Sequence, residues 1–254
     1  MKNKHTNELA VCGIEAVKAL AKHNQKKIRR FYYSVERKYD FSDLCKALAA
    51  RHVPYNLVEN ADLEKLSGTV HHQGAVAMIE QPRLLPLTTD ITGEWLHAKE
   101  PALLLDKVGN ANNLGAIARS MAFFGFKNLV IPLDEAQTSV TTSSYRVAQG
   151  GIEFVNVYTI RSIEKLLASM KGKMARIGTD VAAQTEVSEI PALCEKKPAL
   201  IILGNEERVI SRAAKENCDH LVRIPFGGKR QNIESLNVAH AASIVLYECR
   251  GLAK

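Results

Sequence analysis

Short apolar runs that alternate with helical patterns constrain the fold of this 254-residue chain more than any other feature. Strand-like runs occur at 102–105, 128–131, 154–158, 199–203 and 221–224. Helical patterns start at Asn113, cover 162–170, surround Arg212 and cover 236–249. A strand that is apolar along its whole length is typical of a parallel sheet with helices on both faces. We therefore predict an α/β domain with a parallel sheet over residues 101–254.

The first 80 residues form a second pattern of alternating helices and strands. The periodicity predicts helices over 13–23 and 44–50, the latter capped by Ser42 or Asp43, and strands over 28–35, 55–58 and 75–79. Such an alternation indicates a small α/β/α layer domain. Residues 81–100 carry two prolines and a weak pattern, which predicts a linker with one helical turn around Trp95.

Cysteine usage and hydropathy exclude several classes of protein. The five cysteines are scattered and never spaced as C-x-x-C. This argues against a zinc site and a disulfide framework, and for a reducing cytoplasm. We expect no metal, since the neighbouring His71 and His72 lack a carboxylate or cysteine at ligand spacing. We also expect no membrane association, because no apolar stretch reaches the roughly 18 residues of a membrane span.

Basic residues are concentrated in the first region. Residues 1–82 contain 13 basic and 9 acidic side chains, which gives +4 of the net charge of +7. The candidate RNA contacts are Lys26, Lys27, Arg29 and Arg30, which precede the aromatic run 31–33. Cations mixed with aromatics suit phosphate contact and base stacking. The alternative is a solvated charged face, with at least one of these aromatics buried by strand alternation.

The turn after the first apolar run of the second domain differs from a dinucleotide-binding loop. It lacks G-x-G-x-x-G and instead leads, over 106–112, into a helix that Asn112 or Asn113 would cap. Arg119 then lies within an apolar helix. A buried arginine must be paired, either with a phosphate or carboxylate ligand or with an internal acid such as Glu206.

Two later segments place polar residues beside strand ends. Glu206 follows the apolar run 199–203 at the carboxyl edge of the sheet, where α/β proteins bind ligands, although it could simply favour the positive end of the next helix. Ser235 and Asn237 stand at the start of the last helix, where they could be caps or groups of a site.

Three segments resemble the signature motifs of the TrmH/SpoU family of SPOUT-class RNA 2′-O-ribose methyltransferases. They are LLLDKVGNANNLGAIARSMAFFGFKNLVI (103–131), IILGNEERVISRAAKENCDHLVRIP (201–225) and IESLNVAHAASIVLYE (233–248). The first region, which opens with CGIEAVKAL, is similar to the ribosomal-protein-like substrate-binding domain of many members. The resemblance implies an RNA substrate-binding domain over 1–80, a linker over 81–100 and a SPOUT methyltransferase domain over 101–254.

The resemblance also implies a cofactor, a knot and a site. The sheet would contain a deep trefoil knot, and two copies would form a homodimer with active sites at the subunit interface. S-adenosylmethionine would be held by backbone groups at Gly204, Ile224 and Leu236. The polar active-site set of the family falls on Asn113, Arg119, Glu206, Ser235 and Asn237. Because an arginine is hard to deprotonate, Arg119 would orient an RNA phosphate and make the ribose hydroxyl more acidic.

The chain departs from the family pattern at four positions, namely Asn110, Ala111, Val209 and Ala239. They surround the cofactor loop and do not remove the five polar residues. The leading hypothesis is a cytoplasmic enzyme that methylates a ribose 2′-hydroxyl of rRNA or tRNA. One alternative is a catalytically weak or inactive SPOUT protein that acts as an RNA-binding module. The other, a small-molecule methyltransferase, is disfavoured by the basic first domain.

Overall fold

A computed structural model describes residues 7–133, 139–205, 210–227 and 235–253. The chain forms two compact units. The first comprises Met1–Arg83 and Val140–Phe154, and the second comprises Leu84–Ser139 and Val155–Lys254. The domain boundaries predicted from sequence differ from these units, since they group residues 140–154 with the second domain and set residues 81–100 apart as a linker.

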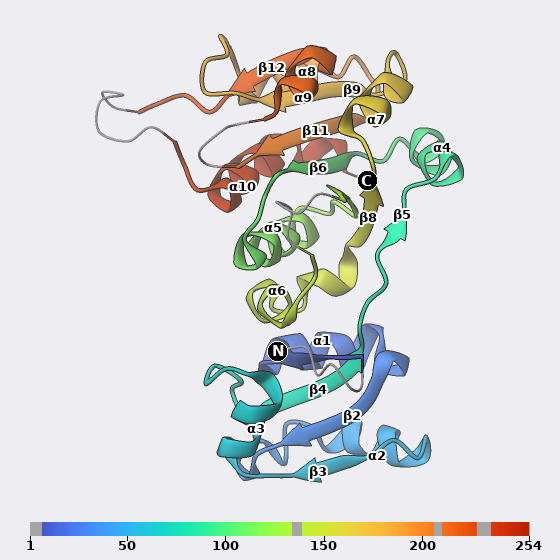
Figure 1. Ribbon diagram of the computed structural model, residues 1–254, viewed down its shortest axis with the longest axis vertical. Coiled ribbons are helices and arrows are strands. Elements are labelled where there is room, and N and C mark those ends of the chain that lie inside the picture. The colour runs from blue at the N-terminus through green and yellow to red at the C-terminus, as the bar shows by residue number, and fades with distance from the viewer. Residues whose placement is uncertain (1–6, 134–138, 206–209, 228–234, 254) are drawn as a thin grey trace. The chain divides into compact units, whose positions relative to one another are not determined.

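The first unit contains a four-stranded sheet in the order β1-β4-β2-β3 (Figure 1). The strands are β1 (Glu8–Cys12), β2 (Ile28–Tyr33), β3 (Tyr55–Leu57) and β4 (Ala75–Glu80). Strand β4 is antiparallel to β1 and β2, whereas β3 is parallel to β2. Three of these strands were predicted. The first strand was not predicted.

Four helices complete the first unit. They are α1 (Ile14–His23), α2 (Ser42–Ala50), α3 (Asn60–Ser67) and α6 (Thr142–Ala148), with short 3-10 turns η1 (Gln25–Lys27), η2 (Val35–Arg37) and η3 (Gly151–Phe154). The predicted cap of α2 is wrong, because Phe41 holds the N-cap position and no side chain caps the helix. Burial of Phe31 and Tyr33, whose rings stack 5.4 Å apart, confirms that strand alternation directs aromatics of this run into the core.

The second unit is built on an eight-stranded sheet in the order β10-β12-β9-β11-β6-β7-β8-β5 (Figure 1). Every neighbouring pair is parallel, which confirms the predicted parallel α/β fold. The strands are β5 (Leu85–Pro86), β6 (Ala102–Asp106), β7 (Asn128–Pro132), β8 (Asn156–Ile160), β9 (Ala175–Thr179), β10 (Thr185–Glu186), β11 (Ala199–Gly204) and β12 (His220–Arg223).

Helices cover both faces of this sheet, as the apolar strands require. The helices are α4 (Thr89–Ala98), α5 (Ala111–Phe123), α7 (Ile163–Met170), α8 (Ile190–Leu193), α9 (Arg212–Asn217) and α10 (Val238–Glu248), with 3-10 turns η4 (Val187–Glu189) and η5 (Arg250–Leu252). Leu104 and Ile202 share one core cluster with side chains of α4, α7 and α9. Strand alternation turns Leu103 and Ile201 to the opposite face, where α5 and α10 pack together.

Residues 81–100 are more ordered than the predicted linker. They contain β5 and the ten-residue helix α4, where the sequence predicts a single turn. Trp95 explains the difference, because it is only 3% exposed and anchors α4 in the core of the second unit. No helix within the described ranges is long and apolar enough to cross a membrane.

Candidate active site

The carboxyl ends of four neighbouring strands meet at one edge of the parallel sheet. In the order β12-β9-β11-β6, these ends lead to Ile224, Asp180, Gly204 and Asp106. Gly204 ends β11 and is in register with Asp106 at the end of β6. Ile224 directly follows β12 and is half-buried. Two of the three predicted cofactor positions therefore lie at the edge where α/β sheets bind ligands.

Asp106 joins two of the loops at this edge. Its side chain is 1% exposed, and its Oδ2 accepts a hydrogen bond of 2.6 Å from the backbone N–H of Ser211. Ser211 also caps α9, because its Oγ accepts from the backbone N–H of Ala214 at 3.3 Å. The buried carboxylate thus fixes the start of α9 beside the end of β6.

The start of α5 and the start of α10 are joined by an amide pair. Asn237 Nδ2 donates to Asn113 Oδ1 at 3.2 Å. Asn237 Oδ1 accepts at the same time from the backbone N–H of Ala239 at 2.9 Å, which makes Asn237 the N-cap of α10. The structure therefore brings together two predicted site residues that lie 124 positions apart in the chain.

The predicted cap of α5 is wrong. Asn110, not Asn112 or Asn113, caps the helix, and its Oδ1 accepts from the backbone N–H of Asn112 at 2.8 Å. The helix starts at Ala111, two residues earlier than expected. Asn113 therefore lies in the first turn, where its side chain is available to Asn237.

Arg119 is exposed, which corrects the expectation of a buried arginine. The buried face of α5 is formed by Leu114, Gly115, Ile117, Ala118 and Met121. Arg119 points away from this face and forms no ion pair with any residue that the structure describes. Its proposed partner Glu206 lies outside the described residues, as does Val209.

The remaining predicted residues lie close in sequence to the Asn113–Asn237 pair. Ser235 is half-buried, and Leu236 is 46% exposed immediately before Asn237. Ser120 Oγ and Ser243 Oγ lie 2.8 Å apart and join α5 to α10 two turns further along. Ala239, one of the departures from the family pattern, is buried; its backbone N–H donates to the Asn237 cap, and its carbonyl accepts from Ser243 Oγ at 3.0 Å.

Sequence reasoning missed two charged residues at this edge. Asp180 follows β9, and its carboxylate lies 2.6 Å from Lys215 Nζ. Burial opposes ionisation of Asp180, but hydrogen bonds from Lys215 and the Ala182 N–H outweigh it and lower the pKa of the carboxyl. Arg223 ends β12, and its Nε is buried without a partner among the described residues. Asp180 could have been found from the sequence only if β9 had been predicted, because Asp180 directly follows that strand.

An orphaned guanidinium nitrogen beside Ile224 fits an anionic ligand group. S-adenosylmethionine carries a carboxylate, so the residues of this edge are compatible with that cofactor. No group of three or more potential metal ligands occurs among the residues that were described.

The four basic residues predicted to bind RNA lie in the first unit. Of these four, Lys26 alone forms no ion pair with the described residues. The other three pair with carboxylates as Lys27–Glu153 (3.4 Å), Arg29–Glu80 (3.2 Å) and Arg30–Glu8. These pairs reduce the positive charge that the predicted patch presents to a phosphate.

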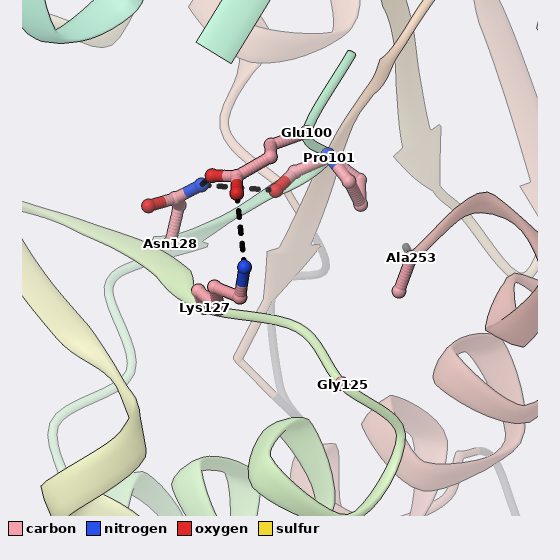
Figure 2. Close-up of a pocket in the computed structure, with 6 residues that line it drawn as sticks. All are labelled: Glu100, Pro101, Gly125, Lys127, Asn128 and Ala253. Atoms are coloured by element: carbon pink, nitrogen blue, oxygen red, sulfur yellow. Dashed lines mark hydrogen bonds and ion pairs between the residues drawn. The ribbon is translucent and has the colours of Figure 1, made fainter. Parts of the chain in front are cut away.

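A small cavity lies at the other edge of the large sheet, at the amino ends of β6 and β7. Figure 2 shows Glu100 there, with its carboxylate accepting from Lys127 Nζ at 3.1 Å and Asn128 Nδ2 at 3.0 Å. The hydrogen bond from Asn128, aided by Lys127, lowers the pKa of Glu100. With a volume of about 10 Å³ the cavity holds one water molecule at most, so it is not a substrate site.

Comparison with known proteins assigns both parts of the chain. Residues 100–247 match the SpoU rRNA methylase family, and residues 10–85 match the RNA 2′-O ribose methyltransferase substrate-binding family. A relative from Ralstonia nicotianae, named 23S rRNA (guanosine-2′-O-)-methyltransferase RlmB, is 30% identical over 93% of this chain and 92% of its own length. An uncharacterized tRNA/rRNA methyltransferase of Mycobacterium avium is 32% identical over 75% of this chain.

The match to the mycobacterial relative spans only 60% of that protein's length. Among solved structures, the SpoU methyltransferase AviRb of Streptomyces viridochromogenes in complex with AdoMet covers 99% of this chain and 93% of its own. The TM-score is 0.75 at 22% identity, which supports the fold alone. The two family matches, the RlmB relative and the parallel α/β fold agree, and the chain belongs to the SpoU rRNA methylase family.

Proposed function

We propose that this protein transfers a methyl group from S-adenosylmethionine to a ribose 2′-hydroxyl of rRNA or tRNA. The observation that carries the proposal is the Asn113–Asn237 amide pair, which joins two family motifs at the carboxyl edge of the sheet. The RlmB name of the Ralstonia relative favours rRNA as the substrate. An RNA substrate and the reduced cysteines favour the cytoplasm as the location.

The cofactor supplies an activated methyl group, so the protein must mainly position two reactants and exclude water. Backbone groups at Gly204, Ile224 and Leu236 would hold the cofactor, with Arg223 available for its carboxylate. Gly204 ends β11, Ile224 follows β12, and Leu236 precedes α10.

Arg119 would act on the RNA rather than on the cofactor. Its guanidinium is exposed and lacks an ion-pair partner in the described part of the chain, so it is free to bind a phosphate. A fixed positive charge beside the ribose stabilises the oxyanion that forms as the 2′-hydroxyl loses its proton. Asn113, Ser235 and Asn237 would orient the nucleotide, and Glu206 completes the proposed set.

A homodimer and a deep trefoil knot are further parts of this proposal. An aromatic group on α5 and α10 supports self-association: Phe123 is 82% exposed, and its ring meets Phe124 at 5.1 Å. Tyr247 is 49% exposed and lies beneath Arg250, whose Cζ is 4.0 Å from the ring centroid. Aromatic and arginine side chains are enriched at protein interfaces. Sedimentation should give a dimer that Phe123→Asp and Tyr247→Asp together convert to monomer.

Calorimetric titration with S-adenosylmethionine tests the proposed function. We expect one cofactor to bind per chain. Arg223→Leu, which replaces the charged guanidinium with an apolar side chain, should weaken this binding. No binding at millimolar cofactor would refute the enzyme and favour the RNA-binding module without activity.

A further inference from the structure

An exposed aromatic pair lies in the first unit, near the predicted RNA contacts Lys26 and Lys27. Phe154, the last residue of η3, is 48% exposed. Its ring meets the ring of His23, the last residue of α1, with centroids 4.5 Å apart and planes at 62°. His23 is also exposed. The two rings together present an exposed aromatic surface on which a planar ligand could stack.

Contacts between η3 and the end of α1 hold the two rings in place. The side chain of Glu153 is 1% exposed and accepts from Asn24 Nδ2 at 2.5 Å and from Lys27 Nζ at 3.4 Å. Gly150 has φ +90°, and a Cβ there would lie 2.5 Å from Cβ of Ala19 on α1. Backbone packing and buried polar bonds thus fix η3 against the end of α1, which reduces the entropy that a ligand must remove.

The charge around the pair is positive. Lys22 and Lys26 flank His23 in the sequence, are exposed, and form no ion pair within the described residues. Lys27 is 50% exposed, but its ammonium is paired with the Glu153 carboxylate, so it adds little to this charge. An apolar protein surface would have to desolvate these lysines, whereas a nucleic acid brings phosphates to them and bases to the rings.

We propose that Phe154 and His23 form a stacking platform for an unpaired base of the RNA substrate, with Lys22 and Lys26 contacting the flanking phosphates. The inference rests on the proposed function and narrows its substrate to an RNA that presents a single-stranded loop. A base inside a duplex is stacked on both sides and cannot reach the ring, so a loop is required.

Fluorescence anisotropy of the full-length protein tests the platform. The probes are a labelled RNA hairpin with unpaired adenosines in its loop and a blunt RNA duplex of the same length. We expect Phe154→Ala to bind the hairpin roughly 5- to 30-fold more weakly and the duplex unchanged, as loss of one stacked base predicts. Tyr39→Ala, which removes another exposed aromatic of the same unit, should bind both as the wild type does.

Phe154→Trp separates stacking from a folding defect. The only tryptophan of the chain, Trp95, is 3% exposed, so a tryptophan at position 154 reports on its own contacts. Its emission should be quenched by the hairpin and not by the duplex. Hairpin binding unaffected by Phe154→Ala, or hairpin and duplex weakened equally, would overturn the platform. If the wild type methylates RNA in either case, the proposed function stands; if it binds neither RNA nor S-adenosylmethionine, both proposals fail.

Discussion

The arginines at the two edges of the eight-stranded sheet differ in how they are paired. At the amino edge, Arg176 is 4% exposed and donates from Nε to Asp219 Oδ2 at 3.0 Å and from Nη1 to the Leu167 carbonyl at 3.0 Å. Glu100 at the same edge is bonded to Lys127 and Asn128. At the carboxyl edge Asp180 pairs with Lys215, but Arg223 keeps a buried Nε without a partner among the described residues, and Arg119, on the helix that begins there, forms no ion pair with them.

This difference suggests that the paired arginine at the amino edge stabilises the fold, whereas the arginines at the carboxyl edge serve function. A buried charge that serves the fold must be paired, because an unpaired one costs several kcal/mol. Guanidinium groups left without acids suit an anionic ligand that is not part of the chain. The contrast predicts that amino-edge substitutions lower stability, while carboxyl-edge substitutions lower methyl transfer.

Arg119→Ala should have the largest effect on methyl transfer. We expect kcat to fall about 100- to 1000-fold, as when one oxyanion-stabilising group is removed. The melting temperature should stay unchanged, because Arg119 is exposed and forms no described ion pair. Arg212→Ala, an exposed arginine of α9, is the matched control and should retain activity. Full transfer by Arg119→Ala would refute its role.

Asp219→Asn should destabilise the protein by about 2–4 kcal/mol, because it leaves the buried Arg176 guanidinium poorly paired. The hydrogen bonds from Arg176 lower the pKa of Asp219 below its usual value of 3.8. The lowered pKa means that this stability is present above about pH 4 and is lost as the pH falls through the folded value. Urea unfolding at pH 7 and at pH 3 should show a smaller difference between wild type and variant at pH 3. An equal difference at both pH values would contradict the pairing.

Gly178→Ala should destabilise by about 1–2 kcal/mol through overpacking. A Cβ at Gly178 of β9 would lie 2.5 Å from Ile210 Cδ1 and 2.9 Å from Cys218 Sγ. Ile210→Val in the same chain should recover part of the loss, since it removes the closest atom. Thermal unfolding of the three proteins measures this, and identical melting temperatures would show that β9 has room for a side chain.

Two substitutions of Asn237 distinguish its role as the N-cap of α10 from its role in the site, where it donates to Asn113. Asn237→Ala should cost about 1 kcal/mol of stability through loss of the α10 cap. Asn237→Asp keeps an acceptor for the Ala239 N–H but cannot donate to Asn113. It should therefore keep most of the stability and lose methyl transfer. Retained transfer in Asn237→Asp would show that donation from position 237 to Asn113 is not needed for catalysis.

The sequence predicts the parallel sheet because most of its strands are apolar throughout. It does not reveal β9, although β9 is central, because Arg176 and Gly178 interrupt the apolar run. The arginine is tolerated only because Asp219, 43 residues later, folds beside it. Such a long-range pair leaves no local signal.

The candidate site was predicted in the same uneven way. Asn113 and Asn237 were named from motifs, and the structure brings them into contact. The exposure of Arg119 could have been derived from helical spacing, because the buried positions 114, 117, 118 and 121 define a face that excludes it. The packing of residues 140–154 within the first unit could not have been derived from the sequence. It depends on the close approach of Gly150 to Ala19 on α1, which are far apart in the chain.

The central claim is that the carboxyl edge of this sheet serves ribose methylation. The most direct measurement is mass spectrometry of nucleosides from deproteinised rRNA and tRNA that have been incubated with the protein and S-adenosylmethionine. We predict a new 2′-O-methylnucleoside that is absent with Arg119→Ala. A methyl group on a base, or no new methylated nucleoside at all, would contradict the assignment.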